Sequence, residues 1–210
     1  GTGPQNQVRD IALMRDGRIL IAGNFVGYNG VMCQYIVRLF ADGIRDAAFN
    51  IPPNSINGQV NAIACQGEDK VVAVGDFFAC SNQSTPHIAR FDPDGSVDLS
   101  FDVGTGFNNN ANCLLVLPDS SILVGGLFGL YNGVLCGNLA LLSPQGPYDA
   151  SMDNTPGFAG GDKTTLVRQP DGKLLVGGYF QYHNTAPASC LIRLNMDGSS
   201  DATFTSPVYP

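Results

Sequence analysis

The fold is decided by the stretch Gln169-Pro170-Asp171-Gly172-Lys173-Leu174-Leu175-Val176-Gly177-Gly178-Tyr179-Phe180. It joins a turn, in which Pro fixes φ and Gly accepts a positive φ, to a short apolar strand that ends in a Gly-x-Phe step. The same step begins at Gly23, Gly75, Gly126 and Gly178, at spacings of 52, 51 and 52 residues. The chain therefore consists of four repeats.

A second marker keeps the same register. It is an Asp followed three residues later by a large apolar residue, and its spacings are again 52, 51 and 52 residues. The four copies are Asp46/Phe49, Asp98/Phe101, Asp149/Met152 and Asp201/Phe204. Two independent markers in one register establish the repeat.

Each repeat has the pattern of β hairpins, seen most clearly in the fourth copy. Strand-like runs there cover 164–169, 173–178 and 190–195, and a short fourth strand is expected at 202–205. The second run of every copy is continuously apolar, which indicates burial on both faces. These second runs are Ile19 to Ala22, Val71 to Val74, Ile122 to Val124 and Leu174 to Val176.

A strand buried on both faces is typical of a blade packed between neighbouring blades. We therefore predict an all-β protein, a β-propeller of four blades with about 52 residues and four strands each. A parallel β-helix is the competing repeat fold, but its coils are usually shorter. We expect one domain over 1–210, with repeats at 1–53, 54–103, 104–154 and 155–206. The ring either closes within the chain or is half of a larger ring.

Composition limits the partners. The formal charge is −7 and the pI about 4.5, so nucleic acid and anionic lipid are not expected partners. There is a single Glu, with 26 Gly and 13 Pro, which disfavours helices. No apolar run reaches the length of a membrane-spanning helix, so we expect no membrane insertion. The chain lacks an initiator Met and is expected to be a processed product or a piece of a longer protein.

Two segments of the fourth copy carry a family resemblance. The stretch quoted above and Ile192-Arg193-Leu194-Asn195-Met196-Asp197-Gly198-Ser199-Ser200-Asp201-Ala202-Thr203-Phe204 resemble the delta-60 repeat, a β-propeller repeat of bacterial and phage proteins. Copies one and four match best, whereas copy two departs at its first turn and copy three at both turns. The resemblance implies an interaction or structural module in large surface, secreted or virion-associated proteins. It implies no defined catalytic residues.

The repeated Asp has a candidate structural partner. An Arg lies eight residues before it in three copies, and a hairpin would place the two residues opposite one another. We predict a bidentate Arg-carboxylate clamp for the pairs Arg38/Asp46, Arg90/Asp98 and Arg193/Asp201. Copy three has Leu141 in place of the Arg, so Asp149 needs another partner.

Aromatic residues recur at two positions. Phe25, Phe77, Phe128 and Phe180 share one register position and are interpreted as blade core. The loop after each Phe combines an aromatic residue with Asn in three copies. These residues form a candidate rim for a sugar or a protein partner, and a turn packed by its own Tyr is the alternative. The rim candidates are Tyr28, Asn29, Tyr131, Asn132, Tyr182, His183 and Asn184.

Metal and catalytic signals are weak. Asp92, Asp94 and Asp98 offer oxygen ligands that suit calcium, but turn chemistry explains the same residues and the full calcium loop is missing. We expect no cofactor and no resident metal. The two His residues, His87 and His183, occupy different register positions, and no catalytic motif is present. We name no catalytic residue, although a propeller channel could assemble carboxylates such as Asp10, Asp76 and Asp162 for glycoside chemistry.

The six cysteines are expected to be free. Cys33 and Cys136 are equivalent residues two repeats apart, beyond disulfide reach in a four-bladed ring. Cys65 and Cys113 lie in or beside buried strands. We therefore expect synthesis in a reducing compartment, with a virion or cell-surface destination.

Three function classes remain. The leading hypothesis is a non-enzymatic structural or adhesive propeller within a phage virion or a bacterial surface assembly, which binds protein partners or further copies of itself. A carbohydrate-binding propeller is the alternative. A channel-centred glycoside hydrolase or lyase is the third.

Overall fold

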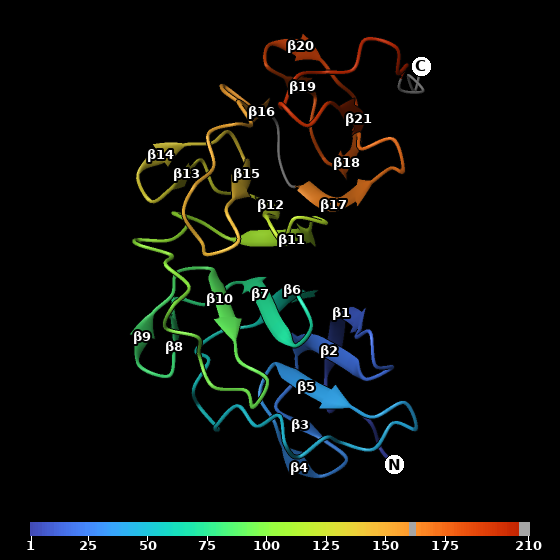
Figure 1. The fold of residues 1–210 in the computed structure, drawn as a ribbon, viewed down its shortest axis with the longest axis vertical. Coiled ribbons are helices and arrows are strands. Elements are labelled where there is room, and N and C mark those ends of the chain that lie inside the picture. The colour runs from blue at the N-terminus through green and yellow to red at the C-terminus, as the bar shows by residue number, and fades with distance from the viewer. Residues whose placement is uncertain (160–162, 206–210) are drawn as a thin grey trace. The chain divides into compact units, whose positions relative to one another are not determined.

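The computed structural model describes residues 1–159 and 163–205, which contain strands, turns and loops and no helix (Figure 1). In these ranges there is accordingly no helix that is long and apolar enough to cross a membrane. The chain divides into two compact units, Gly1–Gly106 and Phe107–Pro210, and each unit holds two of the four repeats. We call the repeats blades 1 to 4 in chain order. The prediction of an all-β fold built from propeller repeats is confirmed.

Every blade begins with an antiparallel hairpin of two long strands. The first strands are β1 (Gln7–Leu13), β6 (Val60–Gln66), β11 (Ala111–Val116) and β17 (Lys163–Arg168). The second strands are β2 (Ile19–Asn24), β7 (Lys70–Gly75), β12 (Ile122–Gly126) and β18 (Leu174–Gly178). Copy three keeps the turn geometry although it lacks the Gly, because Ser120 adopts a φ of 69° and donates its N–H to the Leu117 carbonyl.

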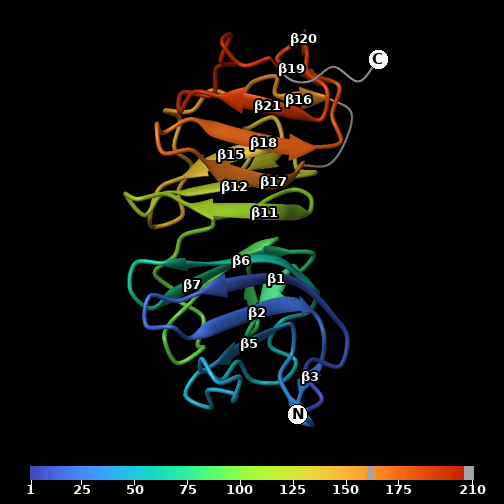
Figure 2. The same cartoon turned by 90° about the vertical axis from the view of Figure 1, so that its right-hand side faces the viewer.

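The second strand is the middle strand of each sheet, as its continuous apolar run predicts (Figure 2). Outer strands pair with it antiparallel; they are β5 (Ile36–Leu39), β10 (Ile88–Phe91), β15 (Leu139–Leu142) and β21 (Leu191–Leu194). The fourth strand of each blade is reduced to one bridge, such as Leu194 to Ser200. The short strand expected at 202–205 is wrong, since the backbone there turns around Asp201.

In every blade, a short hairpin of two two-residue strands connects the second strand to the outer strand. We call these the rim hairpins. They are β3 (Gly27–Tyr28) with β4 (Val31–Met32), β8 (Ala79–Cys80) with β9 (Gln83–Ser84), β13 (Leu130–Tyr131) with β14 (Val134–Leu135), and β19 (Tyr182–His183) with β20 (Ala186–Pro187). One further strand, β16 (Phe158–Ala159), pairs with β19.

The Gly of the repeated Gly-x-Phe step is explained by a β-bulge. The first strand shifts register opposite this Gly in all four blades. The backbone of the first strand consequently lies close to the Cα atom of this Gly. A Cβ atom on Gly23 or Gly75 would lie within 2.3 Å of a backbone carbonyl oxygen of the first strand. Only Gly fits there. The Phe two residues later is the blade core: Phe25, Phe77, Phe128 and Phe180 are each at most 1% exposed.

The core of each unit lies between its two blades. In unit 1 the buried residues Leu20 and Ala22 of β2 pack in one cluster with Ile63 of β6 and Val71 and Ala73 of β7. Unit 2 repeats this arrangement, with Leu123 of β12 packed in one cluster with Leu174 and Val176 of β18. Blade-on-blade packing of middle strands is the packing expected of a propeller.

Candidate functional site: rim hairpins and polar clamps

The rim hairpins have one backbone geometry. Both central residues of each turn have positive φ, which is the type I′ turn whose twist matches the flanking strands. Asn29-Gly30 and Asn132-Gly133 are the preferred sequences for this turn. Ser81-Asn82 and Asn184-Thr185 adopt it as well. Asn29, Asn132 and Asn184 therefore hold turns, and Asn29 Oδ1 also accepts the Gly3 N–H at 2.7 Å.

The aromatic residues of the rim are buried, with one exception. Tyr28 is 8% exposed, Tyr131 and His183 are 0% exposed, and Tyr182 is 45% exposed. The expectation that Tyr28, Tyr131 and His183 present rings to a ligand is wrong, because their side chains are turned into the blade. Tyr182 is the predicted rim aromatic that stays accessible.

These buried side chains tie the rim hairpin to the last turn of the same blade. Tyr28 Oη donates to the Gly43 carbonyl, and Tyr131 Oη donates to the equivalent Gly146 carbonyl, both at 2.8 Å. In blade 4, His183 takes this position and its Nδ1 lies 2.9 Å from Ser200 Oγ. Burial lowers the pKa of His183, so the neutral imidazole is favoured.

Blade 2 has Cys80 at the equivalent position, and its side chain is far shorter than that of Tyr. A cavity of about 280 Å³ lies between the rim hairpin and the last turn of this blade. Its polar lining includes Ser81 and Gln83 from the hairpin and Asp94 and Ser96 from the turn. Burial raises the pKa of Cys80 to about 11, so its thiol is protonated at neutral pH.

The rim hairpins of blades 1 and 3 expose apolar side chains on their second strands. Val31 and Met32 on β4 are 46% and 59% exposed, and Val134 and Leu135 on β14 are 44% and 54% exposed. The corresponding strands β9 and β20 expose the polar pair Gln83-Ser84 and the small apolar pair Ala186-Pro187. The sequence analysis did not identify the exposed apolar residues of β4 and β14. The signal was present in the shared pattern Tyr-Asn-Gly-Val-Met/Leu-Cys of copies one and three.

The structure brings together the three predicted Arg/Asp pairs. Arg38 Nε lies 2.7 Å from Asp46 Oδ2, and the pairs Arg90/Asp98 and Arg193/Asp201 have the same contact at the same distance. The contact differs from the bidentate fork that we expected. The second carboxylate oxygen, Oδ1, accepts the backbone N–H two residues further on, as in the bond from Ala48 to Asp46.

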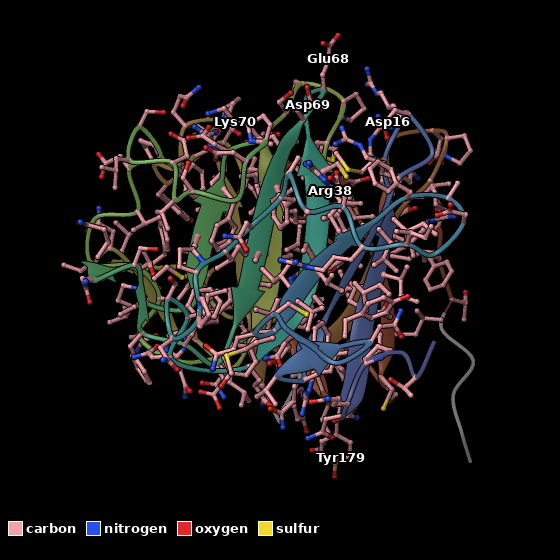
Figure 3. The ribbon with its side chains drawn as sticks, turned by 90° about the horizontal axis from the view of Figure 1, so that it is seen from below. Asp16, Arg38, Glu68, Asp69, Lys70 and Tyr179 are labelled. Carbon is pink, nitrogen blue, oxygen red and sulfur yellow. The ribbon has the colours of Figure 1, made fainter. Side chains whose placement is uncertain are left out.

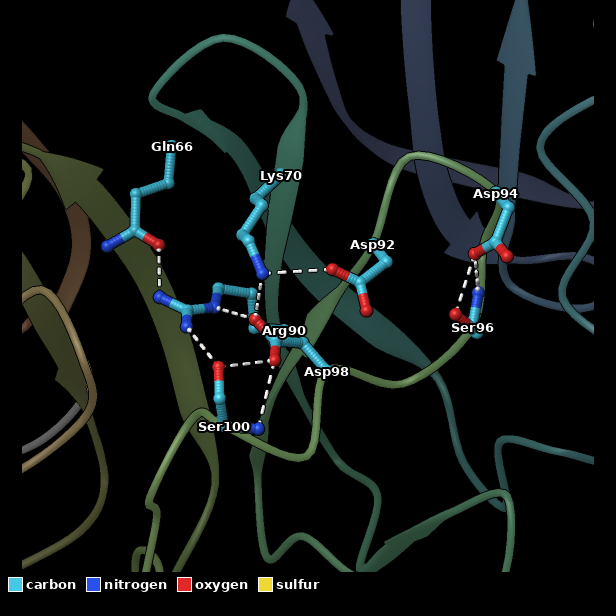
Figure 4. A network of polar contacts seen from close by, with 8 residues as sticks. All are labelled: Gln66, Lys70, Arg90, Asp92, Asp94, Ser96, Asp98 and Ser100. Carbon is cyan, nitrogen blue, oxygen red and sulfur yellow. Dashed lines mark hydrogen bonds and ion pairs between the residues drawn. The ribbon is translucent and has the colours of Figure 1, made fainter.

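Each pair has two further members that the sequence reading missed. A second cation reaches the same Oδ2 atom: Arg18 at 3.3 Å from Asp46, Lys173 at 2.6 Å from Asp201, and Lys70 on Asp98 (Figure 4). The signal for these cations is their position, 28 residues before each Asp. The guanidinium carbons of the three Arg also lie 4.6 to 5.0 Å from ring centroids, namely those of Phe49, Phe101 and Phe204.

Figure 3 labels two clamp residues of unit 1, Arg38 and Lys70, together with the neighbouring Asp16 and Asp69. Asp16, Asp69 and Lys70 lie at one edge, and Arg38 lies deeper. Arg18 joins the Asp16 and Asp69 carboxylates at this edge, at 2.6 and 3.2 Å.

Blade 3 lacks the second cation, the Arg and the Phe of the clamp. Ser121 replaces the second cation, Leu141 the Arg and Met152 the Phe. Asp149 keeps its bond to the Ser151 N–H at 2.9 Å and is more exposed than the other three Asp residues. The cation, the Arg and the Phe thus vary together, and the Asp remains as the cap of the last turn.

The calcium candidate is not assembled. Asp92 and Asp98 both contact Lys70, and Asp94 instead accepts bonds from Ser96 (Figure 4). Within 1–159 and 163–205, no three His, Cys, Asp or Glu side chains are grouped so that they could hold a metal.

Of the three carboxylates named for a catalytic channel, Asp10 and Asp76 lie within the described residues. Asp10 accepts the backbone N–H groups of Ile11 and Ile63 through its two oxygens, at 2.8 Å each. Asp76 belongs to the second Gly-x-Phe step, and Asp162 lies outside the described residues.

The repeats match a known family. The model of a domain of unknown function, the DUF5122 β-propeller, matches residues 14–49, 66–101, 117–151 and 169–204. Each matched segment runs from the first hairpin turn of a blade through its rim hairpin to the Asp turn. The chain belongs to the DUF5122 β-propeller family. No curated protein matches the chain in sequence.

Solved structures resemble this DUF5122 chain in fold. A protein of unknown function from Bacteroides caccae is 15% identical, with a TM-score of 0.51, over 92% of this chain and 58% of that one. The PQQ-bound aldose sugar dehydrogenase of Streptomyces coelicolor is 17% identical, with a TM-score of 0.49, over 83% and 57%. The chain thus spans less than two thirds of the length of both proteins.

Proposed function

We propose that this chain is a non-enzymatic β-propeller module that binds a protein partner through the rim hairpins of blades 1 and 3. One observation carries the proposal: β4 and β14 each expose a Val beside a Met or Leu at the tip of a type I′ hairpin. Aliphatic side chains held in water at the tip of a projecting turn do not contribute to the core. They are available for burial against a partner.

The hairpin geometry favours binding at low entropic cost. Asn29-Gly30 and Asn132-Gly133 fix the turn, and the Tyr28 and Tyr131 hydroxyls anchor it to the blade. A pre-organised apolar tip loses little conformational freedom on binding. Each unit therefore presents one apolar tip on an anchored hairpin, which supports an interaction role.

We further propose that the module serves a larger assembly, such as a phage virion or a bacterial surface structure, which mediates protein or host-surface binding. The support is the resemblance of copies one and four to the delta-60 repeat. The acidic net charge of −7 makes nucleic acid a poor partner for this surface.

The test is site-specific crosslinking in the cell or virion that contains the protein. A photoreactive amino acid replaces Met32 or Leu135, and matched controls carry it at Gln83 or Ala186 on the other two rim hairpins. We expect the first two positions to crosslink to one protein, identified by mass spectrometry. Equal labelling from all four positions, or none above background, would refute binding through the apolar tips.

A carbohydrate-binding role is the second candidate, and the cavity of blade 2, which combines polar and apolar side chains, favours it. Asn50, Gln83 and Asp94 line this cavity beside the exposed, apolar Leu99. A glycan array measures the alternative directly. Sugar binding that is lost in Gln83→Ala and retained in Met32→Lys would support it, whereas an array without signal would exclude the cavity as a glycan site for the sugars displayed.

A further inference from the structure

Three polar side chains of unit 2 form one hydrogen-bonded chain at the rim hairpin of blade 4. His183 Nδ1 lies 2.9 Å from Ser200 Oγ, and His183 Nε2 lies 2.7 Å from Asn154 Oδ1. His183 belongs to β19, Ser200 follows the last turn of blade 4, and Asn154 belongs to the loop before β16. We call Ser200, His183 and Asn154 the blade 4 triad.

The triad departs from the repeat at His183 and at Ser200. Blades 1 and 3 have Tyr28 and Tyr131 at the position of His183, and each Tyr hydroxyl donates to a backbone carbonyl of the last turn. His183 instead meets a side chain, that of Ser200. The other blades have at the position of Ser200 the residues Arg45, Val97 and Tyr148. Because a Tyr alone anchors the hairpin, anchoring does not account for a Ser and a His at these two positions.

Asn154 is the third departure from the repeat. Its position is held after blades 1 and 2 by Ile51 and Val103, which are buried and aliphatic, and Asn154 itself is 0% exposed. A buried amide costs free energy unless its hydrogen bonds are made. Here Nδ2 donates to the Gly137 carbonyl at 3.0 Å, and Oδ1 faces His183. Three separate departures that meet in one hydrogen-bonded chain indicate a functional site, because local rules are broken mainly at such sites.

The hydrogen bonds of Asn154 fix which nitrogen of His183 carries the proton. Because Nδ2 of Asn154 is turned to the Gly137 carbonyl, its Oδ1 can only accept, so His183 Nε2 donates to it. Nδ1 is then unprotonated and accepts the hydrogen bond of the Ser200 hydroxyl. Burial lowers the pKa of His183, so this neutral imidazole is the form present at neutral pH. The triad thus combines a nucleophile, a base that faces it and a third group that orients the base.

The base of the triad is held in place, and the nucleophile faces solvent. His183 is 0% exposed, and its ring centroid lies 4.7 Å from that of Phe158 on β16, the strand that pairs with β19. Ser200, by contrast, is exposed. A reagent in solvent can therefore approach Ser200 while the imidazole keeps its orientation, and this fixed geometry lowers the barrier to reaction.

We propose that Ser200 is an activated nucleophile that accepts an acyl group from activated carboxylic esters. Ser200 Oγ attacks the ester carbonyl carbon, the new Oγ–C bond replaces the bond to the leaving phenoxide or alkoxide, and the hydroxyl proton passes to His183 Nδ1. The imidazolium keeps its bond to Asn154 Oδ1 and then loses the proton to solvent. The product is an O-acyl serine. This stoichiometric modification goes beyond the proposed function and is independent of it, because the apolar tips take no part.

The test is the reaction of the full chain with p-nitrophenyl acetate at neutral pH. Absorbance follows the release of p-nitrophenolate, and peptide mass spectrometry locates the acetyl group. We expect acetylation of Ser200 in the folded protein, none there in denaturant, and loss of the reaction in Ser200→Ala. Ser199→Ala is the matched control, because Ser199 is exposed in the same turn but its hydroxyl donates to Asp197 at 2.6 Å. This control is expected to react like the wild type.

His183→Tyr separates the base from the hairpin anchor. It introduces the residue of blades 1 and 3, whose hydroxyl anchors the hairpin, and it removes the acceptor of the Ser200 proton. We expect unchanged circular dichroism and an acetylation rate of Ser200 that is lower by about 100-fold or more, the usual contribution of a general base. The comparison of folded with denatured wild type makes the same test without a substitution.

Three results would overturn the proposal. The first is a folded wild type in which Ser200 stays unmodified. The second is acetylation of Ser200 at the same rate in denaturant or in a folded His183→Tyr protein. The third is equal acetylation of Ser199 and Ser200, which would show that the hydroxyl facing His183 has no special reactivity.

Discussion

Four equivalent residues, one in each blade, hold a left-handed backbone conformation. Each directly precedes the outer strand of its blade and has a φ of 62° to 71°. The backbone of each of these residues is hydrogen-bonded to the Gly-x-Phe step of its blade. In blade 4, for example, the Cys190 N–H donates to the Phe180 carbonyl at 3.0 Å, and the Cys190 carbonyl accepts the Gly178 N–H at 2.9 Å. The four residues are Tyr35, His87, Asn138 and Cys190. Asn and His are residue types enriched in this region, whereas Tyr and Cys are not.

Cys190→Asn is therefore expected to stabilise the protein. Cys190 is exposed, so the substitution costs no packing, and Asn relieves left-handed strain by about 0.5 kcal/mol. Cys190→Val, a β-branched residue of similar size, is expected to destabilise by about 1 kcal/mol at the same site. Denaturant unfolding of the three proteins measures both changes. Equal stability of Asn and Val variants would contradict the strain argument.

At the scale of the element, the bulged first strand makes the repeated Gly obligatory. Gly75→Ala places a Cβ 2.3 Å from the Gln59 carbonyl oxygen, so the strand must move, at a cost of about 1–3 kcal/mol. Gly129→Ala meets no atom within 4 Å and is the control, with a change within about 0.5 kcal/mol. Thermal unfolding compares the two. A Gly75→Ala protein as stable as the control would show that the bulge is not fixed.

The clamp is the second element whose energetics can be tested, because blade 3 provides its natural replacement. Arg90→Leu leaves the buried Asp98 with Lys70 as its main cation and is expected to cost about 3 kcal/mol. Lys70→Ser and Phe101→Met introduce the residues that blade 3 has at the other two clamp positions. We expect the triple variant to lose less stability than the sum of the three single variants, since the members share one network. Strict additivity in denaturant titrations would contradict this coupling.

The clamps also predict a pH dependence. Burial acts to raise the pKa of Asp98, but bonds from Lys70, Ser100 and Arg90 outweigh it and hold that pKa below its ordinary value of 3.8. The bond from Lys173 has the same effect on Asp201. Because the unfolded chain then binds protons more readily, the stabilisation is complete above about pH 4 and falls as pH decreases. Melting temperatures between about pH 7 and 3 measure this slope, which should be shallower in Asp98→Asn; an unchanged slope would assign acid sensitivity elsewhere.

At the scale of the whole molecule, the six free thiols report on folding. Cys190 is exposed, Cys65 is half-buried and the other four are buried. Burial also raises the pKa of Cys80 to about 11 and of Cys136 to about 12, so thiolate is scarce there at neutral pH. Iodoacetamide at about pH 7.5 is expected to alkylate Cys190 first in native protein and all six thiols in denaturant. Rapid native labelling of Cys80 or Cys136 would show that their blades open.

The sequence predicted some contacts of the candidate site and missed others, for physical reasons. Spacing located Arg38 and Asp46, because a hairpin fixes which residues face one another. It did not show that Arg18 joins them, since that contact depends on how side chains converge on one carboxylate. Nor did it show that Tyr28 turns inward: an aromatic residue beside an Asn-Gly turn has the same sequence whether it points to solvent or to a carbonyl in the last turn.

The sequence by itself determined the repeat, the all-β propeller class and the buried middle strands, because these follow from local turn chemistry and from apolar runs of strand length. The tertiary structure alone decided which faces are covered. Ile11 and Ile63 occupy one register position and have the same side chain, yet they are 62% and 3% exposed. Burial depends on the neighbour that packs against a blade, and a repeat in sequence does not state which blade has one.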